Sequence, residues 1–349
     1  MNGAAGAGAP RVGVVGAGAL GYHHARLLRD LPGVRFAGFY DADPARRAHV
    51  ADALGVEAHA TFASLLDAAD ALTIVVPTPA HFEVARAALA RGMHLLIEKP
   101  ITTTLAEADE LLALAASTEA IVQTGHVERF NRAVRAALPY VDAPRFIESD
   151  RLAPFTTRGA DVAVVLDLMI HDIDLVRTFV GGGVREVRAT GVPVLTPTVD
   201  IASARLAFAS GAVANITASR VSRDRLRKVR IFQESGYLSL DLAAGGGEFF
   251  RLRDGVDVAA IAAGLAGGAA PGGTAGPIDL AVFVERVPLA APDAEPLRLE
   301  LESFGATLRG EQPVAVSGSD GREALAVALE IVAEIERTLP ALRGAAARA

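Results

Sequence analysis

The chain has 349 residues, a formal net charge of −7 and a hydrophobic content of 51%. This length exceeds what one hydrophobic core usually covers, so we expect two domains. The negative charge argues against binding nucleic acid, and cysteine is absent, which excludes disulfides and thiolate metal sites and fits a cytoplasmic protein. We expect residues 1–10 to form a flexible tail, not a signal peptide, and no apolar run reaches the ~18 residues that span a membrane.

The first 125 residues alternate short apolar runs with amphipathic stretches. The predicted strands are 11–15, 34–40, 71–76, 94–98 and 120–124, and the predicted helices are 19–31, 44–53, 79–91 and 105–116. Strands separated by single helices favour a parallel sheet with right-handed crossovers. We therefore predict an α/β Rossmann domain over residues 1–125.

A glycine-rich turn joins the first predicted strand to the first predicted helix. Gly16, Gly18 and Gly21 have the G-x-G-x-x-G spacing, which lets a pyrophosphate lie on the helix N-terminus. Asp41 ends the second strand, where a carboxylate hydrogen-bonds the ribose hydroxyls and repels a 2′-phosphate. The motif predicts NAD rather than NADP. We expect Arg46 and Arg47, just beyond it, to lie on a solvated helix face.

Lys99 follows Ile97 and Glu98 at the end of the fourth predicted strand and precedes Pro100. Ligands of open α/β sheets bind outside the carboxyl ends of the strands, so this position suits a reacting lysine. An ordinary surface lysine at a strand end is the alternative.

The alternation of predicted strands and helices ends after residue 125. One predicted helix, 164–180, precedes the strands 184–192, 201–208, 213–220, 228–234 and 237–242, which have no helices between them. We predict an α+β domain over residues 126–349, with a large, mostly antiparallel sheet that serves substrate binding and oligomerisation. The glycine-rich stretch 264–277 is expected to be a mobile loop, and 322–338 is expected to be an amphipathic helix that packs on either domain.

Asp167 and His171 lie four residues apart in the predicted helix 164–180, which puts them on one helix face. A histidine oriented by a carboxylate is a suitable proton acceptor for a substrate hydroxyl. The alternatives are a surface pair and the start of a metal site. No motif supplies a third metal ligand, so we predict no metal.

Together these motifs resemble the glucose–fructose oxidoreductase / inositol 2-dehydrogenase / rhizopine catabolism (Gfo/Idh/MocA) family. The resemblance rests on the Gly16–Gly21 turn, the segment 76–81, Glu98-Lys99-Pro100 and the segment 167–171. It implies that Lys99, Asp167 and His171 are catalytic. It also implies that the cofactor contacts Gly16, Gly18, Ala19, Leu20, Gly21, Asp41, Pro77, Thr78, His81, Glu98, Lys99 and Gly125.

Two further segments, 125–131 and 151–155, resemble a nucleotide-sugar branch of this family, the UDP-N-acetylglucosamine 3-dehydrogenases. Six of the eleven residues from Arg220 to Arg230 are basic, and arginine suits the oxygens of a diphosphate. A solvated strand edge is the alternative interpretation of this run. The predicted substrate contacts are Lys99, His126, Arg129, Asn131, Arg151, His171, Arg223 and Arg225.

The sequence thus predicts an NAD-dependent dehydrogenase that oxidises a secondary hydroxyl of a sugar, with UDP-N-acetylglucosamine at C3 as the expected example. Either His171 or Lys99 would accept the hydroxyl proton. A dehydrogenase of a free polyol or monosaccharide and a non-catalytic NAD-binding sensor are the two alternatives. We also expect a homo-oligomer, a dimer or tetramer, with no partner other than a small-molecule substrate.

Overall fold

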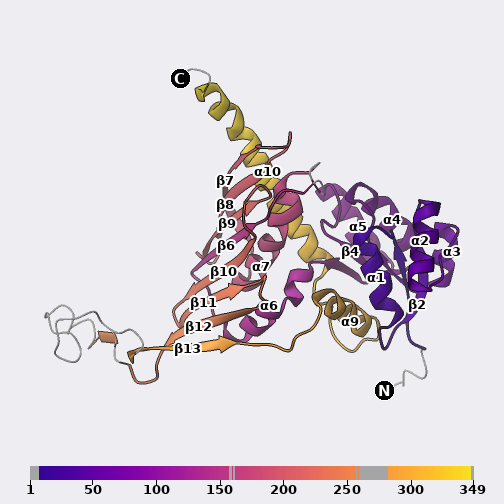
Figure 1. Ribbon diagram of the computed structural model, residues 1–349, viewed down its shortest axis with the longest axis horizontal. Helices are drawn as coiled ribbons and strands as arrows, with labels where there is room; N and C mark the ends of the chain where they lie inside the picture. Colours follow the sequence, from indigo (N-terminus) through magenta and orange to yellow (C-terminus); the bar gives the residue numbers. More distant parts are fainter. Residues whose placement is uncertain (1–7, 157–158, 160–161, 257, 260–281, 347–349) are drawn as a thin grey trace.

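The structure is a computed structural model that describes residues 8–156, 159, 162–256, 258–259 and 282–346. It contains two sheets that lie side by side, one parallel and one mostly antiparallel (Figure 1). This confirms the predicted fold class. The glycine-rich stretch 264–277 lies outside the described residues.

The first sheet has five parallel strands in the order β2-β1-β3-β4-β5. Its strands are β1 (Arg11–Val15), β2 (Arg35–Tyr40), β3 (Ala71–Ile74), β4 (His94–Glu98) and β5 (Val122–Gly125), and its helices are α1 (Ala19–Arg29), α2 (Pro44–Leu54), α3 (Phe62–Ala68), α4 (His81–Leu89) and α5 (Leu105–Ser117). Helix α3 was not predicted, because its seven residues are too few to show a helical period. The carboxyl ends of β1 and β4 lie at the same edge of the sheet, which brings the glycine turn and Lys99 to one side of the domain.

The second sheet has eight strands in the order β13-β12-β11-β10-β6-β9-β8-β7. Its strands are β6 (Phe146–Leu152), β7 (Val184–Val192), β8 (Ile201–Phe208), β9 (Val213–Ser219), β10 (Leu226–Gln233), β11 (Gly236–Asp241), β12 (Gly246–Leu252) and β13 (Val284–Leu289). All neighbours are antiparallel except β6 and β9, which are parallel. Helices α6 (Arg132–Ala137) and α7 (Ile170–Val180) cover one face (Figure 1).

Strand β6 lies in the middle of this sheet, although no strand is predicted there from the sequence. Its inward positions are Ile147, Ser149 and Arg151, so two of its three buried side chains are polar. Alternation of apolar and polar residues is the signal by which a half-buried strand is recognised. Buried polar groups remove that signal. Strands β12 and β13, beyond the last predicted strand, were also missed.

The C-terminal helices contact both domains. Helix α9 (Pro296–Leu308), which was not predicted, packs on α1 of the first domain. Helix α10 (Gly318–Ala346) is longer than expected and contacts α5 and β5 as well as α7 and β7. The final helix therefore packs on both domains rather than one. In the described part of the chain, no helix is both long and apolar enough to cross a membrane.

Candidate active site

The glycine turn has the geometry that a dinucleotide needs. Gly16 has a φ of +91°, and a Cβ on Gly21 would lie 2.0 Å from the Gly16 carbonyl oxygen, so the helix packs on the turn without a side chain between them. Gly18 is exposed and has open space where its side chain would be. The Asp41 carboxylate accepts a hydrogen bond from the Ala17 amide at 2.7 Å. These residues fit the pyrophosphate and ribose of a bound NAD.

Arg46 and Arg47 are not on a solvated helix face as expected. Nε of Arg46 donates to the Ala17 carbonyl at 2.6 Å, and Arg47 donates to the Asp41 carbonyl at 2.6 Å. Both guanidinium groups are thus half-buried against the turn and the end of β2. They support the backbone that positions Asp41.

Lys99 points from the end of β4 into the region between the two sheets. Its Nζ donates a hydrogen bond to the Asp167 carbonyl oxygen at 2.6 Å and lies 3.5 Å from Asp167 Oδ1. Only 18% of the side chain is exposed. Burial lowers the pKa of Lys99, while the charges of Asp167 and Glu98 oppose that shift.

The residues that precede α7 form a π-helical turn, Val165–Met169, rather than the regular helix expected. This turn places the carbonyl group of Asp167 opposite Lys99. The Asp167 carboxylate pairs with Lys99, and within the described residues Nδ1 of His171 has no hydrogen-bond partner. Among the described residues the Asp167 carboxylate makes no hydrogen bond to the His171 ring, so the predicted orientation of His171 by that carboxylate is absent.

His171 is half-buried at the start of α7. Burial and the positive charge of Lys99 lower its pKa well below the usual value of 6.5. The imidazole is neutral at pH 7 and is thus able to accept a proton. Lys99, Asp167 and His171 lie together, as the sequence predicted, although their contacts differ.

Glu98 and Gly125 lie beneath Lys99, at the ends of the neighbouring strands β4 and β5. A Cβ on Gly125 would lie 2.9 Å from the Glu98 carboxyl group, so the glycine is what allows that carboxylate to fit. Glu98 Oε1 also lies 3.3 Å from Nε2 of His24, a buried residue of α1. Glu98 and Gly125 are buried and support the lysine from below. The sequence gives no indication of a role for His24 beyond its position one turn after Gly21.

The predicted cofactor residues of the segment 76–81 divide into two groups. Pro77 is exposed and Thr78 is half-buried, so both are accessible at the sheet edge. His81 is buried, with Nδ1 2.8 Å from the Pro100 carbonyl oxygen and Nε2 2.9 Å from that of Val76. His81 therefore connects the backbone that follows Lys99 to the backbone that follows β3, and it does not line the cofactor site.

Arg151 is also buried instead of facing a substrate. Its Nε donates to Asp172 at 2.6 Å and its NH1 donates to Glu128 at 2.8 Å, and all three side chains are less than a tenth exposed. Ser149 donates to the same Asp172 carboxylate at 2.9 Å. The pairs join β6 to α7 and to the turn after β5. This is a structural role, because a guanidinium held between two carboxylates has no free edge for a ligand.

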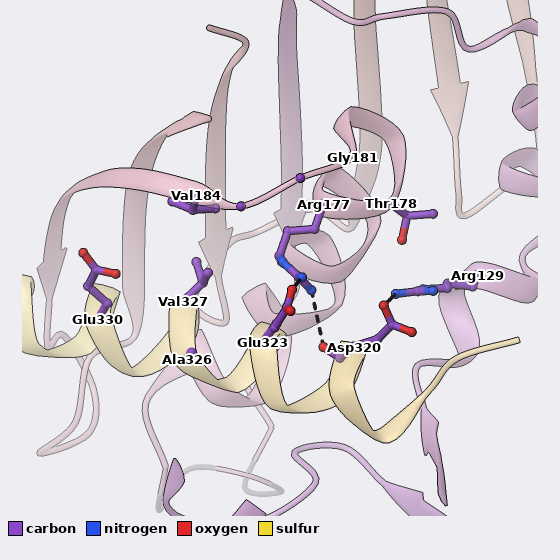
Figure 2. A pocket seen from close by; sticks show the side chains of 12 residues that line it. Arg129, Arg177, Thr178, Gly181, Val184, Asp320, Glu323, Ala326, Val327 and Glu330 are labelled. Atoms are coloured by element: carbon purple, nitrogen blue, oxygen red, sulfur yellow. Dashed lines mark hydrogen bonds and ion pairs between the residues drawn. The ribbon is translucent and has the colours of Figure 1, made fainter. Parts of the chain in front are cut away.

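Arg129 and Asn131 are likewise held by the protein. Arg129 makes two hydrogen bonds to Asp174, at 2.8 and 2.6 Å, and Asn131 caps α6 by accepting a hydrogen bond from the Ala133 amide. Figure 2 shows Arg129 beside Asp320 at a pocket of about 570 Å³ between α7 and α10. Arg177 also points into this pocket and pairs with Glu323. The predicted substrate roles of Arg129 and Asn131 are thus replaced by structural ones.

The remaining predicted substrate contacts differ in their exposure to solvent. His126 has no exposed surface, whereas Arg223 and Arg225 are exposed in the connection between β9 and β10. Arg227, from the same basic run, lies 3.3 Å from Glu128, and Arg220 is buried beside Asp200. Arg223 and Arg225 are thus accessible to an anionic ligand, whereas Arg220 is not.

The site therefore combines a half-buried lysine, a neutral imidazole and a dinucleotide-type turn. Such a set can hold a hydroxyl group, accept its proton and stabilise negative charge on its oxygen. Within the described residues, no group of three histidine, aspartate or glutamate side chains is arranged to hold a metal ion.

Comparison with known proteins gives two family-model matches. Residues 10–126 match the model described as an oxidoreductase family with an NAD-binding Rossmann fold, and residues 132–239 match the GFO/IDH/MocA C-terminal domain.

The chain is 37% identical to a UDP-N-acetylglucosamine 3-dehydrogenase of Acidithiobacillus ferrooxidans, over 94% of this chain and 98% of the relative. A solved structure of that enzyme superposes with a TM-score of 0.83 and 34% identity, covering 95% of this chain and 98% of the other. A scyllo-inositol 2-dehydrogenase (NAD(+)) of Bacillus subtilis is 31% identical over 61% of this chain and 68% of its own.

Proposed function

The chain belongs to the Gfo/Idh/MocA family of NAD-dependent oxidoreductases, and from this premise we propose that it oxidises the C3 hydroxyl of UDP-N-acetylglucosamine. The observation that carries the proposal is the placement of Lys99 and His171, which lie near each other at the edge of the sheet that also carries the dinucleotide turn. The substrate class is supported by the similarity to the Acidithiobacillus enzyme over nearly the whole length of both chains.

In this proposal the residues of the site bind the cofactor, accept the hydroxyl proton and stabilise negative charge. The turn 16–21 and Asp41 hold NAD, which when bound supplies the acceptor for the hydride that leaves the carbinol carbon. Neutral His171 accepts the hydroxyl proton. The Lys99 ammonium group, held by the Asp167 carbonyl oxygen at 2.6 Å, stabilises the negative charge that develops on the oxygen.

A substrate screen tests the proposal. UDP-N-acetylglucosamine, free N-acetylglucosamine and scyllo-inositol are offered at equal concentrations with NAD, and NADH absorbance is followed. The UDP-sugar is expected to give the highest kcat/KM by a wide margin. Equal or faster oxidation of the inositol would assign the chain to the polyol dehydrogenases instead, and binding of NAD without oxidation of any sugar would favour a sensor.

The exposed arginines of the β9–β10 connection give a prediction about the nucleotide. If Arg223 and Arg225 contact the diphosphate, replacing both with glutamine should raise the KM for the UDP-sugar and leave kcat nearly unchanged, because uniform binding is lost. UDP alone should compete with substrate for the wild-type protein. Arg205→Gln, an exposed arginine of β8, is the control. An unchanged KM in the double variant would support the alternative interpretation, in which the basic residues of segment 220–230 form a solvated strand edge.

Asp41 gives a prediction about the cofactor. Asp41→Ser should narrow the preference for NAD over NADP, because the serine no longer repels a 2′-phosphate and because Arg46 and Arg47 remain beside it. The dissociation constants of both dinucleotides, measured by fluorescence titration for both proteins, provide the check. Tighter binding of NADP than of NAD by the wild-type protein would refute the assigned role of Asp41.

We also propose that the chain forms a homo-oligomer through the face of the large sheet that α6 and α7 leave open. Phe146, Phe232, Tyr237 and Phe250 lie on directly opposite positions of four neighbouring strands, with ring centroids 5.5, 5.4 and 4.7 Å apart in turn. A row of half-exposed aromatic rings favours association with another apolar surface. Tyr237→Asp should shift the mass measured by light scattering towards the monomer. A wild-type protein that is already monomeric at micromolar concentration would contradict this proposal.

A further inference from the structure

A cluster of buried titratable side chains lies behind Lys99 and His171, and the proposed mechanism does not use it. Its members are His24 of α1, Glu98 of β4, His126 after β5 and Glu300 of α9. His24, His126 and Glu300 have no exposed surface, and Glu98 is 7% exposed. The four residues come from elements that meet there, since α9 packs on α1 and on the turn that follows His126.

Most of the polar atoms of this cluster lack a hydrogen-bond partner. Among the described residues, both ring nitrogens of His126 and both carboxyl oxygens of Glu300 are buried and unpaired, and so is Nδ1 of His171. Buried polar atoms are rarely left without partners in folded proteins, and internal water usually supplies them. The unpaired atoms therefore indicate a hydrated interior that links these side chains.

His126 connects this interior to the active site. Its ring meets the ring of His171 edge to face, with the centroids 6.5 Å apart and the planes at 87°. Neither ring nitrogen of His126 has a hydrogen-bond partner among the described residues, so the two rings share no direct hydrogen bond, and a bridging water would join them. The carboxylates of Glu98 and Asp174 act electrostatically on both His126 and Glu300, which associates these two residues with the same pair of carboxylates.

Alcohol oxidation releases one proton for each hydride transferred, and a bound nucleotide sugar would cover the route from His171 to solvent. We propose that His126 is the residue to which His171 passes this proton, and that the cluster of His24, Glu98, His126 and Glu300 holds it until the product leaves. The substrate O–H bond breaks, His171 gains that proton on one nitrogen, and its other nitrogen gives a proton through water to His126. In the reverse reaction the same path returns the proton. The inference rests on the proposed role of His171.

The pKa shifts of His126 and Glu300 agree with a role in holding the proton. Burial, Arg129 and Lys99 lower the pKa of His126, against the opposing charges of Asp174 and Glu98, and His171 also faces the ring. Burial and the charges of Glu98 and Asp174 raise the pKa of Glu300 well above the usual range. At neutral pH the His126 imidazole is thus neutral, and burial favours the protonated form of the Glu300 carboxyl group.

The test compares His126→Gln and Glu300→Gln with His59→Gln, which replaces a buried histidine of the first domain whose Nε2 lies 2.8 Å from the Ala37 carbonyl oxygen. Stopped-flow measurement follows NADH absorbance and a pH indicator in the same turnover. In the wild-type protein and in His59→Gln, proton release should lag behind NADH formation. In His126→Gln the lag should vanish and kcat should fall by up to ~10²-fold at unchanged KM. Glu300→Gln should shorten the lag. Release without a lag in the wild-type protein would overturn the proposal.

A second measurement needs neither substrate nor cofactor. Nitrogen-15 spectra of the histidine rings should show the His171 signals shifting in His126→Gln and unchanged in His59→Gln, because the proposal links His171 through water to His126 and not to His59. Unshifted His171 signals would also overturn the proposal. His171→Gln distinguishes failure of this inference from failure of the proposed function. If His171→Gln is inactive while His126→Gln behaves as wild type, only the proton transfer to His126 fails. If His171→Gln is fully active, the proposed function of His171 fails as well.

Discussion

Replacing Lys99 with methionine is expected to lower kcat by ~10²–10⁴-fold while NAD still binds. The methionine keeps the length of the side chain but removes the ammonium group that faces the Asp167 carbonyl oxygen. The turn 16–21 and Asp41 do not depend on that group, so the dissociation constant for NAD should change little. Steady-state kinetics with the UDP-sugar and a fluorescence titration with NAD measure the two quantities separately.

The residual activity of Lys99→Met should also show a shifted pH profile. The positive charge of Lys99 helps to lower the pKa of His171, so its removal raises that pKa. A base is lost as the pH falls through its pKa, and the acid limb of kcat should therefore move to higher pH in the variant. Arg91→Met, an exposed arginine of the first domain, controls for the loss of a positive charge. Near-normal turnover in both Lys99→Met and His171→Ala would place the active site elsewhere.

Replacing Arg151 with methionine is expected to destabilise the protein by ~3–5 kcal/mol, because two buried carboxylates lose their shared cation. Among the residues that the structure describes, Asp172 then keeps the Ser149 hydroxyl as a donor, and Glu128 keeps Arg227 and Asn131. Urea unfolding followed by circular dichroism measures the change in the free energy of unfolding.

Arg205→Met is the matched control for that experiment, because Arg205 lies in the same sheet but is exposed, and its loss should cost less than ~0.5 kcal/mol. The double change of Arg151→Met with Asp172→Asn should recover part of the stability, since an unpaired buried charge is removed. If Arg151→Met were as stable as the wild-type protein but bound the UDP-sugar poorly, Arg151 would be a substrate contact, as the sequence analysis first predicted.

The local sequence determined much of the dinucleotide site. The spacing of Gly16, Gly18 and Gly21, and of Asp41 after them, is a property of one strand, one turn and one helix. Contacts within such a short unit depend little on the rest of the chain. The alternation of strands and helices likewise predicted the parallel sheet, and strands without intervening helices predicted the antiparallel one.

The tertiary structure alone decided which charged residues face a ligand and which hold the protein together. Arg129 and Arg151 carry the same functional group as Arg223 and Arg225, but the first two are paired with carboxylates of α7, whose position relative to β6 no local pattern encodes. The π-helical turn before α7 likewise directed Asp167 to Lys99 rather than to Nδ1 of His171. Sequence specifies the chemical groups and their local spacing, whereas burial and partners arise from contacts between residues far apart in the chain, and these determine the charge state and the role of each group.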